Sequence, residues 1–458
     1  MKKINIAFLI IIGLAVTSCE KALDVEPQQT IDASTALQDD QDLNSLVVGA
    51  YATLGSGSLY GTNLLMDPDL LGSNGVATWR GTFQSPRQIA TKTMTRDNAD
   101  ASLIWTAAYD AINTSNVALA NLGIVKDADL KKQLQGEALF IRGIMHFELV
   151  RLYALPWGAT ADNSQPGVVI KTTPTNNESE AFEKIPRSTV KQVYDQVISD
   201  LTQAAGLLPE QNEKRASKYA ALAFLSRVYL QQANYTGALD AADQVIKSGY
   251  FKMNAAVSAV FSNKNTDESI WEIQQNEQNN AGTANNGMAT FYASLPGIGR
   301  ADVRITKAWI DTAYQANDLR YSEWYYVGTG ARPGNYYSGK WKSFSQNLPV
   351  VRIAEMYLTR AECNLRLNSN VGATPAEDLA QVKNSVRTNT NAPANPTLLD
   401  ILKERFIELA FEGQRIHDLR RLRLPTGSFA WNDDKLVMPI PQREVDATGG
   451  IIAQNPGY

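Results

Sequence analysis

The pattern of apolar and polar residues along the chain indicates long amphipathic helices. Three segments have apolar residues recurring every three or four positions, the spacing of one helix face. They are QDLNSLVVGAYATL (residues 41–54), SLIWTAAYDAINTSNVALANL (102–122) and LKKQLQGEALFIRGIMHFELVRLYALPWG (130–158). Convincing strand patterns are few. We therefore predict a mainly α-helical chain with long loops.

Two later segments resemble degraded tetratricopeptide units. SKYAALAFLSRVYLQQANYTGALDAADQVIKSGYF (217–251) has small residues such as Ala238 and Ala242 where two helices of a unit would cross. VVRIAEMYLTRAECNLRL (350–367) followed by TPAEDLAQVKNSV (374–386) has a similar pattern. We expect stacked helix pairs that form a single compact unit, an architecture that by itself specifies no ligand.

The N-terminus has the features of an export signal. Lys2 and Lys3 precede an apolar run over residues 6–16, which is shorter than the roughly 20 residues of a membrane-spanning helix. The run ends in VTSC, which resembles a bacterial lipobox. We predict a signal peptide over residues 1–18, a lipid on Cys19 and a tether over 19–35. The alternative is ordinary secretory cleavage, with Cys19 incidental.

Composition excludes several classes of function. The net charge of −4 is too small and too evenly spread to attract nucleic acid. The second of the two cysteines, Cys363, would have no partner if Cys19 carries lipid, so we predict no disulfide and a buried, apolar role for Cys363. No catalytic triad order, phosphate loop or cluster of metal ligands stands out, and we expect no cofactor and no metal.

Polar, glycine-rich and aromatic residues are concentrated in two insertions, one at 64–88 and a larger one that runs through 279–304 and 318–341. Loops this long are usually functional or disordered, and disordered segments are rarely so aromatic. An aromatic ring can stack on the C–H face of a sugar while polar side chains bond its hydroxyls. The candidate sugar-binding residues are Asn74, Trp79, Arg80, Trp324, Tyr325, Tyr326, Tyr336 and Tyr337. The alternative is that these aromatics hold the loops to the scaffold.

ERFIELAFEGQRIHDLRRL (404–422) collects charged residues near the C-terminus. Opposite charges recur three positions apart, where they can meet on neighbouring helical turns. Thr397 and Asp400 supply capping chemistry upstream. His417 has no His or Cys neighbour in sequence to complete a metal site. We therefore interpret this motif as an ion-paired structural helix, not an active site.

This motif, with KLVMPIPQREVDATGGIIAQNPGY after it, closely resembles the C-terminal signature of SusD-like (RagB/SusD) outer-membrane proteins of Bacteroidetes. EALFIRGIMHFELVRLYALPWG (137–158) and DLRY (318–321) are similar to the family's earlier motifs and occur in the same order. The resemblance covers nearly the whole chain. It implies a SusD-like N-terminal helical region over 36–215 and a C-terminal region with loop insertions over 216–458.

The resemblance implies a lipid-anchored protein of the outer membrane, facing the exterior. Such a protein captures an oligosaccharide and delivers it to a SusC-like TonB-dependent transporter. Catalysis is not implied, and the resemblance assigns no binding residues to this chain. The alternatives are a peptide or other nutrient as ligand, a glycoside hydrolase, which would need two carboxylates across a sugar bond, and an adaptor for protein partners.

Overall fold

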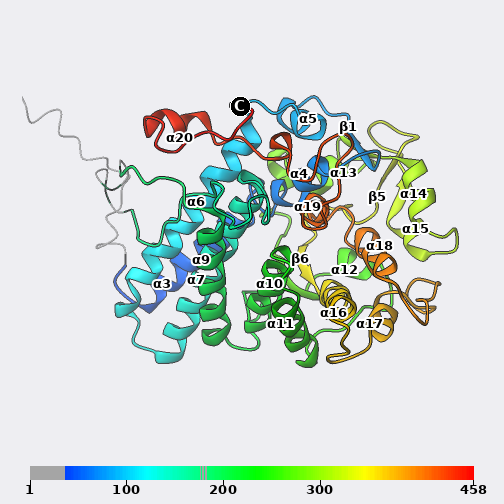
Figure 1. Cartoon of the computed structure of the whole chain (residues 1–458), viewed down its shortest axis with the longest axis horizontal. Coiled ribbons are helices and arrows are strands. Elements are labelled where there is room, and N and C mark those ends of the chain that lie inside the picture. Colours follow the sequence, from blue (N-terminus) through cyan, green and yellow to red (C-terminus); the bar gives the residue numbers. More distant parts are fainter. Residues whose placement is uncertain (1–36, 176, 178–179, 181–182) are drawn as a thin grey trace, which may run out of the picture.

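The structure is a computed structural model that describes residues 37–175, 177, 180 and 183–458. The predicted signal peptide, Cys19 and the tether lie outside the described residues. Most of the ordered elements are helices, as predicted (Figure 1).

A continuous series of helices forms the scaffold, each packed against the next. In order of contact they are α3 (Asp40–Leu54), α6 (Ala99–Ala120), α7 (Ala128–Tyr153), α9 (Val190–Leu207), α10 (Lys218–Gln231), α11 (Tyr235–Lys247), α16 (Ile353–Leu367) and α17 (Pro375–Val382). Figure 1 shows them running from α3 at one end of the long axis toward α17. The predicted amphipathic segments correspond to α3, α6 and α7, and the tetratricopeptide-like scaffold is confirmed.

Small residues allow the helices of the predicted pairs to approach closely. Ser226 on α10 donates a hydrogen bond of 3.0 Å to the carbonyl of Ala238 on α11. Ala238, Ala242 and Cys363 are fully buried around this crossing, so Cys363 is the apolar core residue that was predicted. In the second pair, Thr374 caps α17 through a reciprocal capping box with Glu377.

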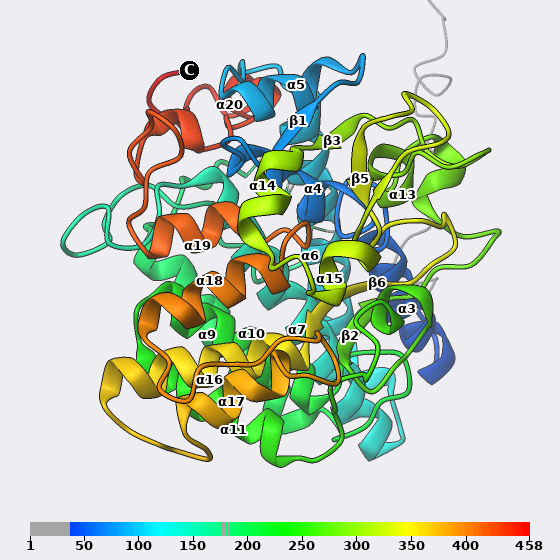
Figure 2. The same ribbon diagram turned by 90° about the vertical axis from the view of Figure 1, so that its right-hand side faces the viewer.

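Two insertions interrupt the scaffold, and they contain more regular structure than the sequence indicated. Between α11 and α16 lie α12 (Ala259–Ser262), β2 (Ser269–Ile273), η3 (Ala281–Ala284), α13 (Met288–Tyr292), β3 (Val303–Ile305), α14 (Lys307–Ala313), α15 (Leu319–Glu323), β4 (Tyr325–Val327), β5 (Tyr336–Ser338) and β6 (Leu348–Arg352). Between α3 and α6 lie α4 (Asn63–Leu71), β1 (Ala77–Trp79) and α5 (Gln84–Thr91). Figure 2 shows β1, β3, β5 and α13 together above α11, α16 and α17.

The remaining elements follow the scaffold or connect its helices. They are η2 (Leu122–Ile124), α18 (Leu398–Glu408), α19 (Arg415–Arg421), η4 (Asp434–Leu436) and α20 (Gln442–Ala447).

An aromatic cluster joins the insertions to the scaffold. Trp271 on β2 contacts Phe140 of α7, Phe224 of α10 and Tyr60, with ring centroids 5.2, 6.1 and 5.7 Å apart. The rings meet edge to face, the arrangement that aromatic quadrupoles favour. Because β2 pairs antiparallel with β6, which leads directly into α16, this cluster fixes both ends of the larger insertion.

The C-terminal charged motif forms two helices, so the prediction of a single helix is wrong. The chain leaves α18 after Glu408 and enters α19 at Arg415, with Phe411 and Gly413 at positive φ between them. A Cβ at Gly413 would lie 2.6 Å from the carbonyl oxygen of Leu64 on α4. Only glycine allows this approach, which also brings the Gly413 and Arg415 N–H groups to the carboxylate of Asp69. Thr397 does cap α18, with Asp400, as predicted.

The break changes the ion pairs. The spacing predicts four pairs, all among described residues: Arg405–Glu408, Glu412–Arg415, Arg415–Asp418 and Asp418–Arg421. Only the last of them forms an ion pair, at 2.6 Å. Arg405 instead binds Asp418 and Glu355, and Glu412 binds Arg352 and Lys340. The motif is ion-paired and structural, as interpreted, but most of its partners come from distant segments.

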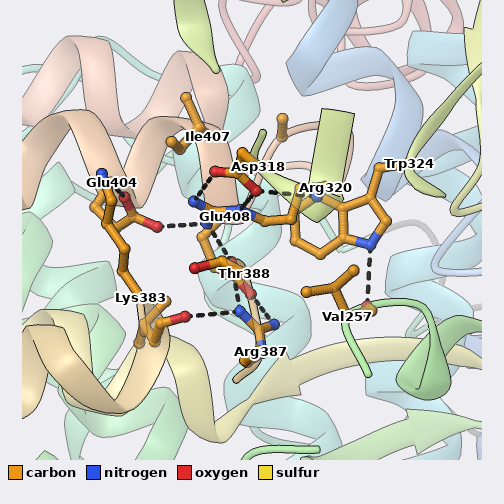
Figure 3. Close-up of polar contacts among 12 residues, drawn as sticks. Val257, Asp318, Arg320, Trp324, Lys383, Arg387, Thr388, Glu404, Ile407 and Glu408 are labelled. Carbon is orange, nitrogen blue, oxygen red and sulfur yellow. Dashed lines mark hydrogen bonds and ion pairs between the residues drawn. The ribbon is translucent and has the colours of Figure 1, made fainter. Parts of the chain in front are cut away.

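Glu408 is at the centre of this network (Figure 3). One of its oxygens accepts from Arg387 at 2.7 Å and from Arg352 at 3.1 Å, and the other accepts from Arg320 at 2.8 Å. All four side chains are buried. Burial alone would raise the pKa of the Glu408 carboxyl, but the three guanidinium groups hold it well below its usual value.

We predict that Glu408→Gln lowers the free energy of unfolding by about 3–5 kcal/mol, because it removes the charge that three buried arginines share. Denaturant titration followed by circular dichroism measures this loss. The control is Asp129→Asn, which breaks an exposed ion pair with Lys132 and should cost less than about 1 kcal/mol. Equal stability losses in the two variants would contradict a central role for Glu408.

Candidate ligand-binding surface

A small antiparallel sheet brings the two predicted insertions together. Its strand order is β1-β3-β5-β4, with Thr78 opposite Arg304, Ile305 opposite Tyr336 and Tyr326 opposite Tyr337. The paired residues Thr78 of β1 and Arg304 of β3 are more than 220 positions apart in the sequence. All of the candidate sugar-binding residues therefore lie in this sheet or beside it.

The loop between β4 and β5 folds back against the sheet. The Tyr337 hydroxyl donates to the Arg332 carbonyl at 2.8 Å, and the Arg332 guanidinium donates to the Arg80 carbonyl. Two glycines allow this close approach. A Cβ at Gly328 would lie 2.3 Å from the Ser294 hydroxyl oxygen, and one at Gly330 would lie 2.2 Å from the Leu295 carbonyl oxygen. The Ser294 N–H in turn donates to the Tyr326 hydroxyl at 2.8 Å. These contacts join the loops at 80–87, 293–301 and 328–335 into one surface.

The candidate residues divide by exposure. Asn74 and Arg80 are exposed, and Tyr326 and Tyr336 are half-buried. Trp79, Trp324, Tyr325 and Tyr337 are buried, at 8%, 0%, 3% and 1% exposure. A ring can stack on a sugar only if one of its faces is open, so the first group is available to a ligand and the buried group is not.

Trp324, the favoured stacking platform from the sequence, is a core residue. Its indole N–H donates to the Val257 carbonyl at 3.0 Å (Figure 3). The ammonium of Lys340 lies 4.0 Å from its ring centroid, and Phe261 contacts the ring edge-on. The alternative role, in which the aromatic residue holds a loop to the scaffold, describes it correctly. The same correction applies to Tyr325, whose hydroxyl lies 2.9 Å from that of Tyr314 within the core.

Trp79 is likewise an anchor. Its indole N–H donates to the Phe83 carbonyl at 3.1 Å, and its ring lies against Phe291 with centroids 5.5 Å apart. The neighbouring Phe83, which was not among the candidate residues, is 41% exposed. The Arg300 guanidinium lies 4.2 Å from the Phe83 ring centroid and donates to the Thr82 hydroxyl at 3.2 Å. The sequence does contain a signal for Phe83, since it is an aromatic residue within the polar, glycine-containing stretch RGTFQSPRQ.

A separate cavity of about 500 Å³ lies between the α9–α10 connection and β2. Its lining is mostly polar and includes Glu210, Lys214, Asp267 and Tyr250, the last 40% exposed. Among the described residues, one buried oxygen of Glu272 in this lining has no hydrogen-bond partner. The cavity is large enough for a small ligand and is therefore a competing location for binding.

His417 is buried on α19 and shares no metal site with other residues. Burial and three nearby arginines hold its pKa well below the usual value, so it is a neutral core residue. Throughout the part of the chain that the structure describes, no group of three or more His, Cys, Asp or Glu side chains is placed to hold a metal ion.

Two family models match this chain. One, described as "Starch-binding associating with outer membrane", matches residues 21–230, and the other, described as "SusD family", matches residues 306–437. The chain is a SusD/RagB-like protein. Over residues 37–458, apart from the few positions not described, no helix has the length and apolar character needed to cross a membrane.

Individual relatives agree with this SusD-like assignment. SusD-like protein P2 of Formosa agariphila is 26% identical over 532 aligned positions that cover 100% of both chains. A SusD superfamily protein from Bacteroides thetaiotaomicron shares the fold with a TM-score of 0.82 at 24% identity, over 91% of this chain and 100% of that one. A structure named "Laminarin binding SusD-like protein" has a TM-score of 0.75 at 21% identity, over 92% and 100%.

We predict that Trp324→Ala lowers the stability of this SusD-like protein by about 3–5 kcal/mol, the usual cost of truncating a buried aromatic residue, and leaves the affinity of the folded molecules for ligand unchanged. Thermal melts and calorimetric titrations on the same preparation separate the two effects. A variant with normal stability and weakened binding would show that the ring does reach the ligand.

Proposed function

We propose that this SusD-like protein captures an oligosaccharide at the surface formed by the β1-β3-β5-β4 sheet and its loops, and delivers it to a SusC-like TonB-dependent transporter in the outer membrane. The observation that carries the proposal is the convergence of open aromatic and polar groups. Half-buried Tyr326 lies on the sheet face from which exposed Arg80 leaves, with exposed Phe83 and Asn74 in the adjoining loops, whereas half-buried Tyr336 faces the other side of the sheet. Apolar ring faces beside hydrogen-bonding groups are what sugar recognition requires.

Two further observations support a glycan as the ligand. One structural neighbour is named for laminarin binding, and one of the matching family models is described as starch-binding. The chemistry of the surface favours binding over hydrolysis. Asp302, the carboxylate beside Arg80, is buried and ion-paired with Arg300 at 3.0 Å and Arg332 at 3.4 Å, so its side chain is not open to a bound sugar.

The predicted lipid on Cys19 would keep the protein beside its transporter. The tether over residues 19–35 leads directly to α3 at one end of the helix series, so the anchor and the sheet are carried by different parts of the fold. Attachment to the outer membrane, with the binding surface facing the exterior, follows from this proposal.

We predict that Phe83→Ala weakens glycan binding about tenfold, or about 1.4 kcal/mol, because the change removes an open ring that contributes little to the core. Glycan and peptide arrays would first identify the ligand, and calorimetric titration would then compare variants. Tyr250→Ala is the matched control, because Tyr250 is 40% exposed, close to the 41% of Phe83, and lines the separate cavity. Loss of binding in the Tyr250 variant alone would move the site to that cavity, and a peptide as the array ligand would overturn the glycan proposal.

We predict that the mature protein begins at Cys19 and carries lipid there. A protein held by two or more acyl chains stays on the membrane, whereas one without lipid does not. Mass spectrometry of the native N-terminus and membrane fractionation of Cys19→Ala measure both consequences. A mature terminus elsewhere, or a Cys19→Ala protein that still sediments with membranes, would refute the anchor.

A further inference from the structure

Arginine residues are concentrated around the proposed glycan surface. Five of them lie on the sheet or its loops: Arg80, Arg87, Arg300, Arg304 and Arg332. Arg87 lies on α5, which begins just after Phe83, and it donates to the Gly81 carbonyl at 2.8 Å. The chain as a whole has a net charge of −4, so this concentration of positive charge is local.

One carboxylate, Asp302, pairs with two of these five arginines. Arg300 and Arg332 approach it at 3.0 and 3.4 Å, and each also binds a loop group, the Thr82 hydroxyl and the Arg80 carbonyl. Burial raises the pKa of the Asp302 carboxyl, and both arginines oppose that rise. These two arginines therefore have a structural role, and a single negative charge cannot neutralise both.

Arg80 and Arg304 have no such structural role. Both are exposed, and neither guanidinium has a hydrogen bond or ion pair to another residue in the described part of the chain. Arg304 lies opposite Thr78 in the sheet, and Arg80 follows two positions after Thr78, so both side chains leave from the same face. Two unpaired guanidinium groups on the face that carries Tyr326 produce a positive potential without stabilising the fold.

Three buried arginines show the opposite arrangement. Arg320, Arg352 and Arg387 each bind two or more carboxylates. At the proposed surface those partners are missing for Arg80 and Arg304, which is the arrangement expected if the ligand provides them.

We propose that the ligand of this surface is an anionic oligosaccharide, one bearing carboxylate or sulfate groups. The planar guanidinium fork binds such oxyanions through two parallel hydrogen bonds, which a neutral sugar cannot provide. Phe83, beside Arg300, would stack against the sugar ring while Arg80 and Arg304 bind its acidic groups. This inference rests on the proposed function and adds the charge of the ligand to it.

The test compares three purified glycans of matched length: an oligogalacturonate for carboxylate, a carrageenan oligosaccharide for sulfate and a neutral laminari-oligosaccharide. Titration calorimetry of the wild-type protein should show that at least one acidic glycan binds tenfold or more tightly than the neutral one. Its affinity should fall steeply as salt is raised. Whichever acidic glycan binds better identifies the oxyanion.

Variants then assign the effect to the two arginines. The double change Arg80→Gln with Arg304→Gln should weaken the acidic glycan at least tenfold and leave melting temperature unchanged. Arg80→Lys with Arg304→Lys should restore part of the affinity, since it keeps the charge and loses the fork. The control is Arg443→Gln, an exposed arginine on α20, well away from β1 along the long axis in Figure 1, and it should change nothing.

Several outcomes would overturn the inference. Tight binding of the neutral glycan that depends on Phe83 and not on the two arginines would leave the proposed function intact and remove the charge requirement. Equal affinity for a single-stranded oligodeoxynucleotide would reduce the surface to a general anion site. An absence of binding to all three glycans, with a silent glycan array, would overturn the proposed function together with the inference.

Discussion

The fold depends on neutralising buried charge around Glu408. Its carboxylate binds Arg320 from the insertion, Arg352 at the junction of β6 and α16, and Arg387 from the segment between α17 and α18. Burying any one of these charged groups without a partner would cost free energy. When all the segments are in place, each charge is paired with an opposite one. Glu412 extends the same network to Lys340. The network thus makes correct assembly of four distant segments a condition for stability.

The candidate ligand-binding surface is held in place by this network. Arg320 lies in α15, which runs directly into Trp324 and strand β4, so the buried ion pairs and the buried indole fix the start of the sheet. Trp79 does the same for β1 at the other edge. The aromatic residues therefore have two roles. Those that face the core position the strands, and others, such as Phe83 and Tyr326, leave part of the ring open to solvent. Pre-organised side chains of this kind lose little entropy when a ligand binds.

Arginine is likewise used in two ways. Around Glu408, the guanidinium groups of Arg320, Arg352 and Arg387 are paired with carboxylates and hold distant segments together. At the sheet, Arg300 and Arg332 share one carboxylate and hold the loops, while Arg80 and Arg304 project from the same surface. Exposed groups that make no contact within the fold can change without loss of stability.

The sequence alone predicted the amphipathic helical segments at 41–54, 102–122 and 130–158, the tetratricopeptide-like pairs and the family. These features follow from local periodicity or from contiguous motifs. The tertiary structure decided which aromatic rings are exposed. Trp324 is buried because it contacts Val257, which is distant in the sequence, and Lys340, which follows the neighbouring strand β5. It also decided the partners of Glu412 and Arg405, since the turn at Phe411 and Gly413 replaces helical spacing by contacts with distant segments. Spacing along a sequence predicts neighbours on one helix, whereas burial and long-range ion pairs are set by how separate elements meet.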